Sequence, residues 1–148
     1  MKFILLILTF VLIPFTTLAG EKIKGTNFYV GDTQSWETGE GTGYWIWHAK
    51  GIEHPTEGPL ETNPIECHGA GFWDQEESWG EGICIIGAGD DIHTSHWKRE
   101  KGQEVGQSKY VSGTGKFEGI KGEVTIRFIE LPASRSMAEW EGEVSLAK

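Results

Sequence analysis

Glycine is concentrated in one short stretch of the chain, residues 113–122. Four of these ten residues are glycine, and β-like runs flank them, Lys109–Val111 before and Glu123–Phe128 after. A helix would lose about 1 kcal/mol for each interior glycine relative to alanine. In paired strands glycine instead supplies positive φ angles, bulges and close backbone approach. The stretch therefore predicts a tightly twisted β-hairpin.

The rest of the chain continues this β pattern. Short alternating runs of apolar and polar residues are separated by Gly- or Asp-rich turns, as in all-β barrels and sandwiches. Eight runs suit a closed antiparallel barrel, because closure removes exposed sheet edges. The stretches 31–43 and 51–63 carry Gly, Thr, Pro and Glu and are predicted to be loops. The predicted strands are Asn27–Gly31, Tyr44–Gly51, Pro64–Trp73, Trp79–Gly87, Ile92–Arg99, Ser108–Thr114, Glu123–Glu130 and Met137–Leu146.

Two cysteines, Cys67 and Cys84, are predicted to form a disulfide across one hairpin. A turn centred between Gln75 and Glu76 places them directly opposite each other on adjacent strands. Opposed residues of an antiparallel pair can lie within disulfide reach. Such a bond implies an oxidising compartment, and two buried free thiols are the alternative.

The last two runs predict a second hairpin with a defined register. Apolar residues alternate with charged ones in both runs, so one face of each is apolar. A turn centred on Ser134 would place Arg127 opposite Glu141 and Phe128 opposite Trp140. Charge pairing and apolar pairing then agree on one register.

The glycine-rich stretch also resembles a family signature. Residues 113–122 are similar to the Gly-Thr-Gly-Lys-Phe/Tyr-X-Gly-X-X-Gly motif near the C-terminus of allene oxide cyclase-like and dirigent-like proteins, and the resemblance is best from Asp90 to Arg127. It implies a calycin-like eight-stranded antiparallel barrel and a possible homotrimer. It also implies a barrel interior in which characterised members steer the cyclisation or coupling of apolar small molecules. The shared hairpin itself is a structural element and offers no reacting group.

The N-terminus predicts export. Lys2 precedes an apolar run from Phe3 to Ile13, and Thr17-Leu18-Ala19 is a small-residue cleavage site. We expect residues 1–19 to be a cleaved signal peptide and residues 20–148 to form a single secreted or periplasmic barrel domain, free of the membrane after cleavage. A retained membrane anchor is the alternative. The formal net charge of −9 disfavours nucleic acid as a partner.

Aromatic side chains are the first candidate for function. They are numerous for so small a barrel, and an apolar cavity at a barrel mouth is a common ligand site. The alternative is that they fill the barrel and pack a subunit interface, since eight strands enclose little free space. The predicted ligand-binding residues are Tyr44, Trp45, Trp47, Trp97, Tyr110 and Trp140.

Glu66, His48 and His68 are the candidate catalytic residues. An inward-pointing Glu66 would have a raised pKa and could act as an acid or base, whereas an outward one would be a surface charge. Either histidine could transfer protons near neutral pH or simply be satisfied in the barrel wall. His93 and His96 invite a metal hypothesis, but residues three apart on a strand point to opposite faces. No metal and no cofactor are therefore predicted.

Three functional hypotheses remain from the sequence. The first is a barrel that binds an apolar small molecule. The second is a cyclase or isomerase that acts on such a molecule through a carboxylate or histidine in the lumen. The third is a non-catalytic structural or oligomerising surface protein with a filled barrel. The first two require an open lumen, and the third does not.

Overall fold

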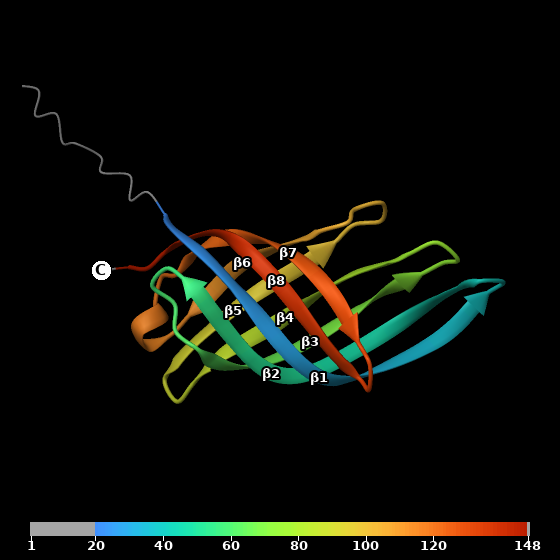
Figure 1. Cartoon of the computed structure of the whole chain (residues 1–148), viewed down its shortest axis with the longest axis horizontal. Helices are drawn as coiled ribbons and strands as arrows, with labels where there is room; N and C mark the ends of the chain where they lie inside the picture. Colours follow the sequence, from blue (N-terminus) through green and yellow to red (C-terminus); the bar gives the residue numbers. More distant parts are fainter. Residues whose placement is uncertain (1–19, 148) are drawn as a thin grey trace, which may run out of the picture.

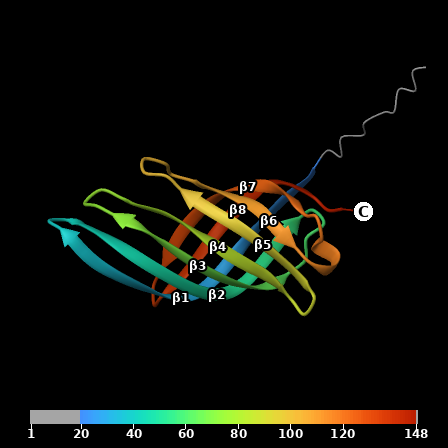
Figure 2. The same ribbon diagram turned by 180° about the vertical axis from the view of Figure 1, so that it is seen from behind.

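The computed structural model describes residues 20–147, and the predicted signal peptide, residues 1–19, lies outside this range. Eight antiparallel strands form a closed barrel in which each pairs with its sequence neighbours and β1 pairs with β8 (Figures 1 and 2). The predicted all-β, eight-stranded antiparallel barrel is confirmed. Its strands are β1 (Glu21–Gly39), β2 (Thr42–Glu57), β3 (Asn63–Trp73), β4 (Ser78–Ala88), β5 (Asp91–Arg99), β6 (Gly106–Gly113), β7 (Lys121–Leu131) and β8 (Arg135–Ser145).

The first two strands are much longer than the sequence predicted. β1 pairs with β8 only from Glu21 to Val30, and beyond that point it pairs with β2 alone. The β1–β2 hairpin therefore extends past one end of the barrel (Figure 1). The prediction of loops at 31–43 and 51–63 is wrong for most of both stretches, because they lie in these strands. Cross-strand pairing satisfies their backbone groups, and strand formation depends more on such context than on composition.

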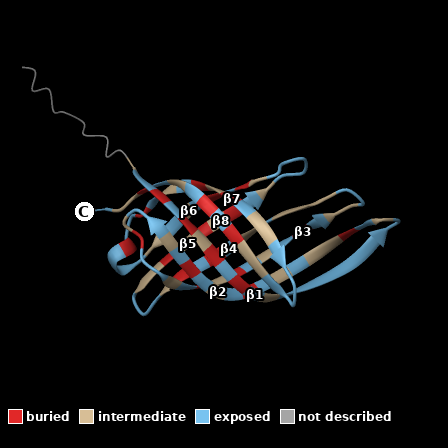
Figure 3. Cartoon of the chain, in the orientation of Figure 1, coloured by how far each residue is buried: buried red, intermediate tan, exposed pale blue. Residues whose placement is uncertain are grey.

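Apolar side chains alternate inward along the strands and fill the barrel. In β8, Ala138, Trp140 and Val144 are buried, whereas Glu139 and Glu141 are exposed. The same alternation gives the pattern of buried and exposed bands on the wall in Figure 3. The core also contains residues from the other strands and from the loops at one end, including Ile23, Tyr29, Ala49, Leu60, Ile65, Ile86, Trp97, Phe117, Ile120, Val124 and Ile126.

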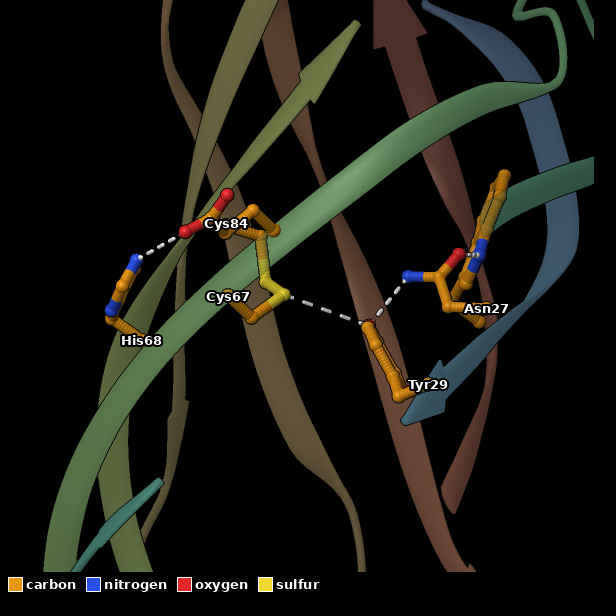
Figure 4. The surroundings of a disulfide bond; sticks show 7 residues. Asn27, Tyr29, Cys67, His68 and Cys84 are labelled. Atoms are coloured by element: carbon orange, nitrogen blue, oxygen red, sulfur yellow. Dashed lines mark hydrogen bonds and ion pairs between the residues drawn. A yellow bond between two sulfur atoms is a disulfide. The ribbon is translucent and has the colours of Figure 1, made fainter. Parts of the chain in front are cut away.

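The predicted disulfide is confirmed. Cys67 of β3 and Cys84 of β4 are direct cross-strand partners, with an S–S distance of 2.03 Å and Cα atoms 4.1 Å apart. Both sulfurs lie inside the barrel (Figure 4). The bond is consistent with an oxidising compartment. Within residues 20–147, we find no helix with the length and apolar character needed to cross a membrane.

The predicted register of the β7–β8 hairpin is wrong by two residues. Arg127 lies opposite Glu139, and Trp140 lies opposite Ile126. The connecting turn is centred on Ala133, and both Ala133 and Ser134 have positive φ, 64° and 53°. A two-residue slip keeps every side chain on its predicted face, so the apolar pattern alone could not detect it.

The glycine-rich stretch forms a longer connection than the predicted tight hairpin. β6 ends at Gly113, a single 3-10 turn covers Gly115–Phe117, and β7 begins at Lys121. Gly115 has φ of +55°, and a Cβ atom there would collide with the Asp91 carboxylate. That carboxylate accepts a hydrogen bond of 2.9 Å from the Lys116 backbone N–H. The turn thereby inserts the Phe117 ring into the end of the barrel.

Candidate functional site

A large cavity opens at the end of the barrel where the β1–β2, β3–β4, β5–β6 and β7–β8 turns gather. Its volume is about 880 Å³. Trp45 and Trp47 of β2 and Trp97 of β5 form its inner wall. The other lining residues are Gly31, Thr33, Ser35, Trp73, Ser78, Trp79, Gly80, Arg99, Phe128, Ile129, Glu130, Leu131, Ser134, Arg135 and Ser136. The lumen is therefore open at this end, which we call the mouth.

The tryptophans of the mouth pack as an ordered group. The rings of Trp45 and Trp97 are nearly parallel, with centroids 6.4 Å apart, and Trp47 meets Trp97 edge to face at 6.1 Å. β3 and β4, which lie between the strands of Trp45 and Trp97, provide space because they carry glycine at inward positions. A Cβ at any of these positions would collide with the Trp45 or Trp97 indole; they are Gly69, Gly71, Gly80 and Gly82.

Charged groups border this aromatic wall. The Arg99 guanidinium hydrogen-bonds to the Ser78 carbonyl, which holds it at the cavity edge. Arg135 Nε donates to the Pro132 carbonyl at 2.9 Å. Glu130 is the one acidic residue among the lining residues of the cavity within the described chain. The site thus combines an aromatic wall with two cationic groups, one anionic group and several hydroxyl groups.

Trp97 and Phe128 form the floor of the mouth. Both residues also line a second, much smaller void of about 30 Å³ deeper in the barrel. That volume is sufficient for a single water molecule. Below the floor, the core side chains close the lumen, and Phe117 and Ile120 seal the far end. We call this the closed end.

A buried acid–base pair lies toward the closed end. Glu53 of β2 and His93 of β5 are 4% and 0% exposed, and Glu53 Oε2 lies 3.5 Å from His93 Nε2. Among the described residues, neither imidazole nitrogen nor that carboxylate oxygen has a hydrogen-bond partner. The His93 ring contacts the rings of Phe117 and Tyr110. Buried polar atoms without partners are rare, and they often mark a bound water or a functional role.

A hydrogen-bonded chain runs beside this pair. Trp140 Nε1 donates to Asn27 Oδ1 at 2.8 Å, and Asn27 Nδ2 donates to the Tyr29 hydroxyl at 2.9 Å. The Tyr29 oxygen lies 3.9 Å from Cys67 Sγ (Figure 4). Burial raises the pKa of Tyr29 far above its usual range, and the nearby Glu53 carboxylate acts in the same direction. The phenol is therefore neutral and can only donate or accept hydrogen bonds here.

The predicted ligand-binding residues fall into three places. Trp45, Trp47 and Trp97 line the mouth cavity, whereas Tyr110 and Trp140 line the small inner void. Tyr44 belongs to neither group of lining residues in the described chain, and its ring stacks on exposed Trp36 at 4.8 Å. The structure therefore brings three of the six residues together around the larger cavity.

The predicted catalytic residues lie together on the outer wall. His48 of β2 and His68 of β3 both contact Glu66 Oε1 through Nε2, at 3.0 and 3.3 Å. Lys50 Nζ contacts Glu66 Oε2 at 3.2 Å. The hydrogen bond from His48, and then that from Lys50, lower the pKa of Glu66. Glu66 is thus the outward surface carboxylate of the two alternatives, and it does not face the lumen.

His93 and His96 point to opposite sides of β5. His93 is buried beside Glu53, whereas His96 is half-buried and lies 3.2 Å from Glu81 on the outer side. Residues three apart on a regular strand point to opposite faces, and the structure places these two side chains in that way.

Sequence reasoning did not single out Glu53. It lies in the stretch 51–63 that was predicted to be a loop. A signal was nevertheless available, because Trp45, Trp47, Ala49 and Glu53 occupy alternate positions that all face inward in β2. Extending the two-residue period past Gly51 would have placed this carboxylate in the barrel.

Compared with known proteins, the chain matches neither a protein-family model nor a curated protein sequence. The resemblance to allene oxide cyclase-like proteins therefore stays a prediction from the glycine-rich motif. The arrangement of side chains within the barrel must carry the functional argument.

Proposed function

We propose that the protein binds an apolar, ring-containing small molecule in the mouth cavity. The observation that carries this proposal is the group of Trp45, Trp47 and Trp97 around about 880 Å³ of open space. Ligand cavities commonly occupy about 300–1,000 Å³ and combine aromatic walls with a few polar groups. Arg99 and Arg135 at the rim favour a ligand with a carboxylate or another anionic group at one end.

Binding of 1-anilinonaphthalene-8-sulfonate tests the proposal, because this probe joins fused and single aromatic rings to one anionic group. We expect its fluorescence to rise saturably with a one-to-one stoichiometry. Trp45→Ala together with Trp47→Ala should weaken binding about tenfold or more, since two stacking surfaces are lost. Trp36→Ala, on the β1–β2 hairpin and not among the lining residues of the mouth in the described chain, is the matched control and should bind like the wild type. Equal losses in the control, or no saturable signal, would overturn the proposal.

The buried Glu53–His93 pair favours a second candidate function, a cyclase or isomerase. A carboxylate and an imidazole 3.5 Å apart in a buried site can exchange a proton with a substrate. Trp97 and Phe128 separate the mouth from the void of about 30 Å³ that Glu53 lines, so this function requires the rings to move aside and the void to widen for a substrate. Isomers have the same mass and different chromatographic retention. The small molecules bound to the wild type and to Glu53→Gln can be extracted from each protein after purification from the native host. If the pair is catalytic, substrate and product isomers should be present in different proportions in the two extracts.

The predicted homotrimer is also a proposal. The outer wall carries large exposed apolar side chains, among them Phe28, Ile52, Phe72, Ile83 and Ile85. Such side chains on a soluble protein commonly mark an interaction surface when they are contiguous. Light scattering coupled to size-exclusion chromatography would give the mass in solution, and a monomer mass would end this proposal.

Export to the periplasm or the exterior rests on the N-terminal pattern and suits the disulfide. N-terminal sequencing of the protein from its native host tests it directly. A mature chain that starts at Gly20 is the expected result.

A further inference from the structure

Two histidines and one carboxylate converge on the outer wall of the barrel. His48 of β2 and His68 of β3 are direct cross-strand partners, and their imidazole rings stack with centroids 4.5 Å apart and planes 10° apart. Glu66 lies two residues before His68, so both side chains are on the same face of β3. His68 Nε2 lies 3.3 Å from Glu66 Oε1, and Figure 4 shows His68 next to the disulfide.

The ligand atoms of this cluster lie close together. His48 Nε2 and His68 Nε2 lie 3.0 and 3.3 Å from the same oxygen, Glu66 Oε1, and one ligand atom from each of the three residues lies within 4.8 Å of the others. Zinc bonds of about 2.0–2.1 Å in a tetrahedron place ligand atoms about 3.3 Å apart. Because the two imidazole planes are nearly parallel, both rings must turn toward each other to direct their Nε2 lone pairs at one ion, and the exposure of both side chains leaves room for this rotation.

The backbone under the cluster is held in place. Glu66 and His68 flank Cys67, whose disulfide ties β3 to β4, and β2 pairs with β3 continuously from Gly43 to Glu53. Lys50 engages Glu66 Oε2 at 3.2 Å and leaves Oε1 directed at the two imidazoles. A hydrogen bond to the second oxygen of a ligating carboxylate is a common way to orient it.

We propose that His48, Glu66 and His68 form a binding site for a divalent transition-metal ion such as Zn²⁺. Two imidazoles and one carboxylate are a known zinc ligand set, and a fourth position stays open to water. The three side chains are 47%, 40% and 57% exposed, so an ion can enter directly from solvent. The same ligand set suits Cu²⁺ and Ni²⁺ but not Mg²⁺, which prefers oxygen ligands.

This site is separate from the proposed ligand cavity. His48, Glu66 and His68 are not among the residues that line the mouth cavity or the inner void in the described chain. They lie on the outer wall, and the two proposals can therefore succeed or fail independently.

Isothermal titration of the tag-free, oxidised protein with ZnCl₂ tests the proposal. We expect saturable binding of one ion per chain, and no comparable binding of MgCl₂. His48→Ala, His68→Ala and Glu66→Gln should each weaken Zn²⁺ binding about tenfold or more, since outer-shell changes alone cost 10–100-fold. These exposed positions carry little packing, so the variants should keep the disulfide and the melting temperature of the metal-free protein.

The chain supplies matched controls in two histidines outside the cluster, exposed His54 and half-buried His96. His54 hydrogen-bonds to Thr62, and His96 pairs with Glu81 on β5, so neither belongs to the cluster. His54→Ala and His96→Ala should bind Zn²⁺ like the wild type. Co²⁺ gives a second readout, because three protein ligands and one water produce the intense visible absorption of a four-coordinate ion. Binding that survives in the double variant His48→Ala/His68→Ala, or an octahedral Co²⁺ spectrum, would overturn the proposal.

Discussion

The two ends of this barrel differ in how tightly their side chains pack. At the mouth, inward glycines on β3 and β4 leave room for the Trp45 and Trp97 indoles, and an open cavity of about 880 Å³ remains. At the closed end, the 3-10 turn inserts Phe117 against His93, and the packing leaves little free space. The comparison suggests that the closed end determines stability, whereas the mouth is free to serve binding.

Phe117→Ala, at the closed end, should cause the largest loss of stability. Removal of a fully buried aromatic ring lowers the free energy of unfolding by about 3–5 kcal/mol. Trp45→Ala at the mouth removes a half-buried side chain and should lower it by less, about 1–2 kcal/mol. Denaturant unfolding of both variants measures the difference. Equal losses at the two ends would contradict the proposed division.

Loss of the disulfide should cause the second-largest loss of stability. The Cys67–Cys84 bond joins residues 17 apart in the sequence, and closing a loop of that size stabilises by about 3 kcal/mol. Cys67→Ala/Cys84→Ala should lose about that much in denaturant unfolding. Binding of the fluorescent probe at the mouth should stay within about twofold of the wild type, because neither cysteine is among the residues that line the mouth in residues 20–147. A large loss of binding would show that the barrel wall couples the two regions.

Glu53→Gln should cause a smaller loss of stability than removal of the disulfide. The amide keeps the shape of the carboxylate but removes its charge from a point 3.5 Å from His93, and the loss of this buried electrostatic contact should cost about 1–3 kcal/mol. Denaturant unfolding gives the loss, and the matched exposed change Glu139→Gln should leave stability unchanged. If Glu53→Gln had the same free energy of unfolding as the wild type, the buried pair would contribute nothing to the stability of the closed end.

Asp74 lies at a turn beside the mouth, and its substitution should cause the smallest loss of stability. Its pKa is lowered from 3.8 to about 2, first by the contact with Lys101 and then by the backbone N–H groups of Glu77 and Glu76. A lowered pKa stabilises the folded chain above about pH 4, and this contribution is lost as the pH falls toward 2. Asp74→Asn should therefore be less stable than the wild type at pH 5, and the difference should shrink by pH 2.5. Urea midpoints at the two pH values measure it.

Features set by local alternation could be predicted from the sequence. The eight-stranded barrel, the Cys67–Cys84 pairing and the inward faces of β7 and β8 all follow from a two-residue period between turns. The β7–β8 register could not be fixed, because it depends on the left-handed backbone at Ala133 and Ser134. Apolar patterning is unchanged by that two-residue slip.

The candidate site was predictable only in part. Aromatic content indicated a ligand cavity, and Trp45, Trp47 and Trp97 line one. The buried pair of Glu53 and His93 joins β2 to β5, which are far apart in the sequence, so only the closed barrel brings these residues together. The cluster of His48, Glu66 and His68 likewise required the β2–β3 register.

The closure of the barrel by β1 and β8 also sets the order of folding events. Residues 21–30 pair with residues 135–144, so the first strand finds its second neighbour only when nearly the whole chain is present. Contacts of such long sequence separation slow folding and leave strand edges exposed in the meantime. The β1–β2 hairpin can form early, but its outer edge must wait for the C-terminal strand. A chain shortened before Arg135 would therefore keep an open edge and should aggregate.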